Sequence, residues 1–157
     1  MKYTVEINNK TKDKFSKKKI EAIFERTICL IADKNLNAKK LELSVALVSA
    51  NEICLLNRQY RRKNSATDVL SFAEYEKTKQ LFSDNLSNYD EAIFIGELII
   101  CPSYVKKNAL EDGETFEFAM TYIVSHGILH LLGFSHGKKM FSLQRAVADE
   151  LVGLMKK

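Results

Sequence analysis

The sequence predicts a single α+β domain in which a small mixed sheet of about four strands packs against about five helices. Segments with strand alternation and segments with helical spacing follow one another in mixed order, and the longer helical segments come late. The 157 residues are 46% hydrophobic and include only 6 Gly and 1 Pro, which favours one sizeable core without a long linker. We therefore expect residues 1–157 to form one domain.

The first half of the chain begins with a strand, a helix and a second strand. Tyr3, Val5 and Ile7 alternate with polar residues, which indicates a strand with one buried face. Ser16 is a candidate N-cap for a helix that ends near Asp33, and its apolar stripe consists of Ile20, Ile23, Phe24, Ile28 and Ile31. The second strand is predicted by the alternation of Leu41, Leu43, Val45 and Leu47.

A short helix, a strand and a polar segment follow. Ser49 and Glu52 have the spacing of a capping box, in which each side chain satisfies a free backbone N–H, and the helix that it begins carries Ile53, Leu56 and Tyr60. Residues 69–72 read as a strand. Residues 74–91 predict a long mobile loop because they are rich in turn-forming side chains, namely Asp84, Asn85, Ser87, Asn88 and Asp90.

The last third contains a buried strand and three helices. Residues 93–100 form an almost continuous apolar run of strand length, interrupted only by Gly96 and Glu97, which is typical of a central strand. Pro102 suits the first turn of the next helix. After Asp112 and Gly113, a buried helix built on Phe116, Ala119, Met120, Ile123 and Val124 leads into a histidine-rich segment. The final helix has one apolar side, formed by Met140, Leu143, Val147, Leu151 and Leu154.

Composition narrows the class of protein. No apolar run is long enough to span a bilayer, and the first ten residues lack the hydrophobic centre of a signal peptide, so we expect no membrane partner. Cys29, Cys54 and Cys101 show no disulfide-framework spacing, which favours a reducing, cytoplasmic location. The net charge of +4 and the pI of about 8.9 are compatible with a polyanionic partner but do not require one.

All three histidines of the chain lie within residues 126–136, which read HGILHLLGFSH. His126 and His130 are four residues apart, so on a helix they point to the same side. His136 would lie roughly 9 Å further along the axis if the helix continued, so the chain has to turn back for the three imidazoles to converge. Gly133 stands where a glycine in the left-handed conformation commonly ends a helix.

The spacing of this segment matches the metzincin signature H-E-x-x-H-x-x-G-x-x-H except at one position. Position 127 is Gly, whereas zinc peptidases carry there the Glu that activates the metal-bound water. A peptidase is therefore disfavoured, but metal binding is not. Three protein ligands with one open position are typical of catalytic zinc, so the sequence predicts one Zn²⁺ held by His126, His130 and His136. The alternative is that one or two of these histidines only pack or cap the helix.

A basic cluster precedes the strand at 69–72. It consists of Arg58, Arg61, Arg62 and Lys63, and guanidinium groups match phosphate oxygens with a bidentate fork. The cluster is therefore a candidate RNA-binding group. Taken alone, a short basic stretch is more often a solvated surface.

The chain resembles the YbeY family of metal-dependent endoribonucleases in three blocks, whose order and approximate separation match: LNRQYRRKNSATDVLSF at 56–72, IGELII at 95–100 and HGILHLLGFSH at 126–136. The resemblance implies an α+β domain, a zinc ion held by the three histidines, and cleavage of single-stranded RNA. It places this activity in ribosomal RNA maturation, at the 3′ end of the small-subunit RNA, and in ribosome quality control. The family's functionally important arginine matches Arg61, our candidate catalytic residue.

Two motifs depart from the family pattern. The family usually has Asp immediately before the third histidine, where this chain has Ser135, and its G-D-I strand motif is here Gly96-Glu97-Leu98. If that Asp orients a ligand, its loss would weaken metal binding, since such outer partners typically change affinity or activity 10- to 100-fold.

The leading hypothesis is hydrolysis of an RNA phosphodiester, with Arg61 neutralising the charge that develops on the phosphorus centre. Gly127 cannot remove the proton of the attacking water, and the two candidates for this step are Glu97 and hydroxide already formed on the metal. One rival is another zinc hydrolase, acting on peptides or small molecules. The other is a ribosome-associated protein whose metal stabilises the fold and whose arginines dock RNA without cutting it.

Overall fold

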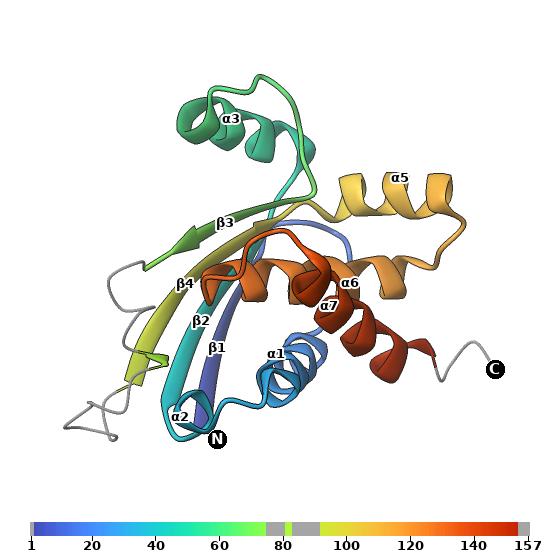
Figure 1. Ribbon diagram of the computed structural model, residues 1–157. Helices are drawn as coiled ribbons and strands as arrows, with labels where there is room; N and C mark the ends of the chain where they lie inside the picture. Colours follow the sequence, from blue (N-terminus) through green and yellow to red (C-terminus); the bar gives the residue numbers. More distant parts are fainter. Residues whose placement is uncertain (1, 75–80, 83–91, 154–157) are drawn as a thin grey trace.

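The computed structural model describes residues 2–74, 81–82 and 92–153. Within them, helices cover one face of a single curved sheet (Figure 1). The elements in chain order are β1 (Lys2–Asn9), α1 (Lys17–Ile31), α2 (Lys34–Asn37), β2 (Lys40–Leu47), α3 (Ala50–Arg61), β3 (Val69–Ala73), β4 (Ala92–Ile100), α5 (Pro102–Asp112), α6 (Phe116–Leu131) and α7 (Lys138–Leu151).

The sheet is mixed and has four strands in the order β1-β2-β4-β3. The strands β1, β2 and β4 are parallel, and β3 pairs antiparallel with β4. The α+β class and the four-stranded mixed sheet are thus confirmed. The strand predicted at 93–100 is β4, which lies inside the sheet between β2 and β3, as expected for its apolar run.

Alternate residues of the strands face a core on one side of the sheet. In β2, the residues Leu41, Leu43, Val45 and Leu47 are each at most 1% exposed, whereas the residues between them are partly exposed. The helices α1, α6 and α7 pack together over this face (Figure 1). On the other face, α3 covers a smaller cluster built on Ile53, Leu70 and Ile99. The side chains of β3 are therefore divided between two environments.

Two glycines allow α6 to lie close to the sheet. An added Cβ at Gly127 would lie 2.7 Å from Cδ2 of Leu98 in β4. Gly96 follows a bulge in β4 and has φ +141°, and a Cβ there would lie 2.3 Å from the carbonyl oxygen of Phe72. Such short distances leave no room for a side chain. The position of the histidine-bearing helix thus depends on the absence of two side chains.

A buried polar contact also ties α6 to α1. The hydroxyl of Thr27 donates to the carbonyl oxygen of Ile23 at 2.7 Å and lies 3.0 Å from the hydroxyl of Ser125. Both side chains are fully buried. Because Ser125 directly precedes His126, this contact fixes the rotation of α6 where the histidines begin.

The N-caps predicted for two helices are confirmed, but other details of the helix ends differ from the prediction. Ser16 and Ser49 cap α1 and α3 by accepting from the backbone N–H of Lys19 and of Glu52, each at 3.2 Å. The reciprocal half of the predicted capping box is not formed, since the Glu52 carboxylate accepts from Lys10 at 2.9 Å instead. The first predicted helix ends at Ile31 rather than near Asp33. Asp33 caps the short helix α2, which the sequence analysis missed, by accepting two backbone N–H groups at 2.9 Å.

Some expectations fall outside the described residues. The turn-forming side chains named for the predicted loop at 74–91 all lie in the undescribed stretch 83–91, and Leu154 of the last predicted helical face lies beyond residue 153. Among the helices that are described, none has the length and apolar character needed to cross a bilayer.

Candidate metal centre

The helix α6 presents His126 and His130 on one side, one turn apart. Thr115 caps the start of α6 by accepting from the backbone N–H of Phe118 at 3.1 Å. The two imidazole rings lie edge to face, with centroids 4.5 Å apart. This is the arrangement that the four-residue spacing predicts.

His136 reaches the same place because the chain turns sharply after α6. Gly133 has φ +90°, the left-handed conformation that glycine adopts without steric cost. The backbone N–H groups of Gly133 and Phe134 donate to the carbonyl oxygens of His130 and Leu129, both at 3.0 Å. The chain then returns, so that Nε2 of His136 lies 2.9 Å from Nε2 of His130. The predicted convergence is confirmed: one nitrogen from each histidine lies within 4.8 Å of the others.

Hydrogen bonds to groups other than the histidines orient two of the three rings. Nδ1–H of His126 donates to Oε1 of Gln144 in α7 at 2.9 Å, and Nδ1–H of His130 donates to the carbonyl oxygen of Phe134 at 3.1 Å. These bonds hold the proton on Nδ1 and leave the Nε2 lone pairs free for a ligand. Gln144 is fully buried, and its Nε2 has no hydrogen-bond partner among the described residues.

The electrostatic environment favours neutral rings. Burial lowers the pKa of His126 below its ordinary value of 6.5, partly opposed by the hydrogen bond to Gln144. Burial and the neighbouring His126 lower the pKa of His130, and Arg61 adds to this effect. Neutral imidazoles are the form that binds a metal ion.

The three side chains therefore fit a divalent metal ion. Two nitrogens bound tetrahedrally to zinc lie roughly 3.4 Å apart, given bond lengths of about 2.1 Å. This value falls between the 2.9 Å that separates the facing Nε2 atoms and the 4.8 Å within which all three ligand nitrogens lie. Three imidazoles suit Zn²⁺, and they also suit nickel, copper and iron. Among the described residues, no fourth His, Cys, Asp or Glu joins this group, so it corresponds to an open rather than a closed site.

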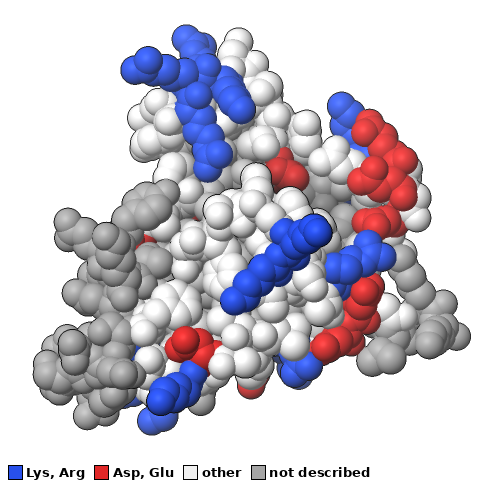
Figure 2. All heavy atoms as spheres, in the orientation of Figure 1, with Lys and Arg blue, Asp and Glu red and all other residues white. Residues whose placement is uncertain are grey.

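The histidines lie at one end of a cavity of about 420 Å³. Its other walls come from Arg61, the last residue of α3, and from residues at and before β3, including Asp68 and Ser71. Arg61 is thus brought together with the histidines. Arg58, Arg62 and Lys63 do not line the cavity and are exposed. Figure 2 shows Lys and Arg side chains gathered on the surface over α3.

The family relationship follows from comparison with known proteins. The family model described as Endoribonuclease YbeY matches residues 6–152. The chain belongs to the YbeY family. The predicted resemblance is thereby confirmed.

Several YbeY relatives cover most of the chain. A protein from Oceanobacillus iheyensis named Endoribonuclease YbeY is 33% identical over 133 residues, which cover 82% of this chain and 85% of the relative. One of the same name from Francisella philomiragia is 37% identical over 114 residues, covering 73% and 68%. A solution structure from Thermotoga maritima superposes with a TM-score of 0.59 at 30% identity, and the match covers 98% of this chain and 92% of that one.

The two departures from the YbeY pattern have different structural settings. Ser135 is exposed in the turn that carries His136, and no hydrogen bond joins its hydroxyl to another described residue. His136 has no ring nitrogen bonded to a carboxylate within the described part of the chain; instead its ring stacks against Phe141, with centroids 5.9 Å apart. The third histidine is thus the least restrained of the three.

The side chain of Glu97 lies away from the histidine cavity. Leu98 packs against Gly127 of α6, so its neighbour Glu97 points to the opposite face of the sheet, where Ser44 donates to its carboxylate at 3.5 Å. Glu97 is not among the residues that line the histidine cavity. Of the two candidates for removing the water's proton, Glu97 thus lies on the face of the sheet away from the histidines.

The sequence analysis missed two residues of this YbeY site. Asp68 is the carboxylate that lines the cavity, and its Oδ1 accepts from the backbone N–H of Val69 at 2.8 Å. Gln144 is the amide that holds His126. A signal for Gln144 was present in the sequence, because a Gln between Met140 and Val147 on the apolar side of a helix is a polar residue at a buried position.

Proposed function

We propose that this chain, as one domain over residues 1–157, is a zinc-dependent endoribonuclease that cuts single-stranded RNA in the cytoplasm. Its substrates are precursors of ribosomal RNA, at the 3′ end of the small-subunit RNA, and it acts in ribosome quality control. The observation that carries the proposal is that three converging imidazoles face the same cavity as Arg61, in a chain whose relatives are named endoribonucleases.

In this proposal, each residue of the cavity has a defined task. One zinc ion held by His126, His130 and His136 would supply Lewis-acid polarisation of a phosphoryl oxygen and lower the pKa of bound water. Gln144 and the Phe134 carbonyl keep the ligand nitrogens of His126 and His130 free of protons. Arg61 neutralises negative charge on the phosphate by a forked hydrogen bond.

Asp68 replaces Glu97 as the candidate proton acceptor. It lines the histidine cavity, and its Oδ1 is fixed by Val69 N–H and by the hydroxyl of Thr67 at 3.3 Å. Its second oxygen remains available to accept the proton of the attacking water. Exposed Arg58, Arg62 and Lys63 would hold the RNA backbone on either side of the cut.

The test is cleavage of a single-stranded RNA by metal-loaded protein. We expect His130→Ala and Arg61→Ala to lose most activity, with Arg61→Ala keeping its metal, because only His130 is a ligand. The matched control is Arg26→Ala, which removes the same charge from α1, outside the cavity and outside the basic cluster. Equal activity in wild type, His130→Ala and Arg61→Ala would disprove the proposal.

A peptidase remains the rival enzyme, and it is opposed by the packing at position 127. A Cβ at position 127 would lie 2.7 Å from Cδ2 of Leu98, so this position of α6 faces the sheet. The Glu that serves as the base in a peptidase would therefore point toward the sheet. Cleavage of a peptide library by the loaded protein would favour that rival.

The exposed basic residues of α3 support a second candidate, an RNA-docking protein that does not cut. Removing the metal separates the two. If the ion is structural, its removal should abolish cooperative unfolding of the protein. If the ion is catalytic, its removal should leave the fold intact. Thermal melting with and without chelator therefore accompanies the cleavage assay.

A further inference from the structure

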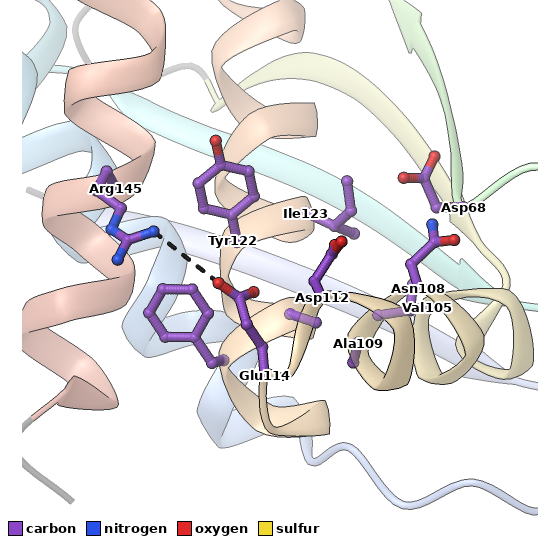
Figure 3. Close-up of a pocket in the computed structure, with 11 residues that line it drawn as sticks. Asp68, Val105, Asn108, Ala109, Asp112, Glu114, Tyr122, Ile123 and Arg145 are labelled. Carbon is purple, nitrogen blue, oxygen red and sulfur yellow. Dashed lines mark ion pairs between the residues drawn. The ribbon is translucent and has the colours of Figure 1, made fainter. Parts of the chain in front are cut away.

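Figure 3 shows a second cavity, which has a volume of about 290 Å³. It lies between α5, α6 and α7, and Asp68 lines both cavities. Its volume is near the lower end of the range for small-molecule sites, about 300–1,000 Å³. The space thus suits one ring system rather than a large ligand.

The helix α6 connects the two cavities. Tyr122 and Ile123 line the second cavity, and they precede His126 by four and three residues. Residues at these spacings share one side of a helix, about 6 Å apart along its axis. A polymer whose phosphate lies at the histidines would therefore bring its neighbouring unit to the second cavity.

The charges of the second cavity exclude a phosphate. Its walls carry the carboxylates of Asp68, Asp112 and Glu114 and the guanidinium of Arg145. Arg145 is already engaged: it lies 3.9 Å from Glu114 and 3.4 Å from Asp149, and its guanidinium stands over the ring of Phe118 at 5.1 Å. The cavity is left with an excess of hydrogen-bond acceptors, so it favours a neutral ligand that donates N–H groups.

Two polar side chains of α5 are free to meet such a ligand. Asn108 and Asp112 are four residues apart on one side of α5, and Figure 3 shows them extending toward the space beside α6. No hydrogen bond joins either to another described residue. Asp112 is the last residue of α5, where the helix dipole disfavours a negative charge, so helix stability does not account for it.

An aromatic wall completes the cavity. The ring of Tyr122 lines it and stacks on Phe118, with an angle of 19° between the rings and centroids 6.4 Å apart. Aromatic side chains bind unpaired bases by stacking, whatever the base.

We propose that this cavity receives one base of the RNA, adjacent to the phosphate at the histidines, and that Asp112 selects bases that carry an exocyclic amino group. This inference rests on the proposed nuclease function. Adenine, cytosine and guanine each present amino hydrogens to a carboxylate. Uracil has no amino group, and its one donor on that edge, N3–H, lies between two carbonyl oxygens, so a carboxylate that accepts from it is brought close to other acceptors and binds it less well.

The experiment compares cleavage of oligonucleotides that differ in one base, either 5′ or 3′ of a single cut. On one of these sides we expect uracil to lower kcat/KM roughly tenfold, the factor for one hydrogen bond to a charged group. Asp112→Asn should abolish this difference, because an amide also donates to a uracil carbonyl. Tyr122→Leu should weaken all four bases alike. Glu111→Gln is the matched control, since it removes a carboxylate from the same last turn of α5 outside the cavity.

A binding measurement distinguishes failure of the base site from failure of the nuclease function. Fluorescence anisotropy measures the affinity of the protein for the same oligonucleotides. If nothing is cut but uracil binds more weakly in a manner that depends on Asp112, the nuclease function fails and the base site stands. If RNA is cut with no base preference at either position, or with a preference that Asp112→Asn leaves unchanged, the base site is disproved and the nuclease function stands.

Discussion

Oε1 of Gln144 lies 2.9 Å from Nδ1 of His126, while the amide nitrogen of the same buried Gln has no partner among the described residues. A buried unpaired N–H group costs about 1–3 kcal/mol, so this amide is poorly explained by stability alone. The buried position of Gln144 is explained if its Oε1 holds the proton of His126 on Nδ1.

Replacing Gln144 by Leu should therefore weaken metal binding more than it weakens folding. The substitution removes the acceptor of His126 Nδ1–H but also removes an unpaired buried donor. We expect metal affinity to fall about 10- to 100-fold, as for other outer partners of ligands. Competition with a chromophoric chelator measures it, with Ser142→Ala, an exposed change on the same helix, as the control. An unchanged affinity would argue against this role.

Ser135→Asp should strengthen metal binding. It restores the residue usual in the family at the position before His136, which is the least restrained histidine of the three. We expect a gain toward the same roughly 10- to 100-fold range. The chelator competition applies again, with Ser142→Asp controlling for the added negative charge. Equal affinities for Ser135→Asp and wild type would show that position 135 does not orient a ligand.

The metal-free protein should lose stability as the solution becomes acidic. The pKa values of His126 and His130 are lowered from 6.5 in the folded state, so the unfolded chain binds protons more readily. Their contribution is fully present above pH 6.5 and is lost as the pH falls toward the folded pKa values. Urea unfolding with chelator from about pH 7.5 to about pH 5.5 should show this slope, and His126→Gln should flatten it. An equal slope in both proteins contradicts the prediction.

Gly127→Ala should destabilise the fold by about 1–3 kcal/mol, the usual cost of overpacking. The new methyl group would lie 2.7 Å from Cδ2 of Leu98, a side chain with no exposed surface. This clash should outweigh the better helix propensity of Ala. Urea unfolding measures the effect, with Gly153→Ala as the control because its nearest contact is an ordinary 3.7 Å. If Leu98 is the cause, the loss in a Leu98→Val background should be smaller.

Local patterns in the sequence were sufficient for much of the fold. The alternation of Leu41, Leu43, Val45 and Leu47 and the cap at Ser16 depend only on neighbours in the chain, and both are confirmed. The turn at Gly133 was predictable for the same reason. The short helix α2 was missed because a four-residue helix is too short to show a periodic apolar pattern. Its one signal in the sequence is the N-cap residue Asp33.

Contacts between distant segments were not predictable. Asp68 joins the histidine cavity because β3 pairs with β4 beneath α6, and Gln144 meets His126 because α7 packs against α6. The face on which Glu97 lies depends on the bulge before Gly96, and a shift of one residue reverses the side of a strand. These relationships are set by tertiary packing, which one sequence does not specify by spacing alone.

The peptide group of Phe134 has two partners in α6. The backbone N–H of this residue binds the carbonyl oxygen of Leu129, and its carbonyl oxygen binds the ring of His130. The same peptide group therefore both ends the helix and orients the imidazole of His130. Fraying of the last turn of α6 would separate the three histidines, and a bound ion would in return stabilise the end of the helix.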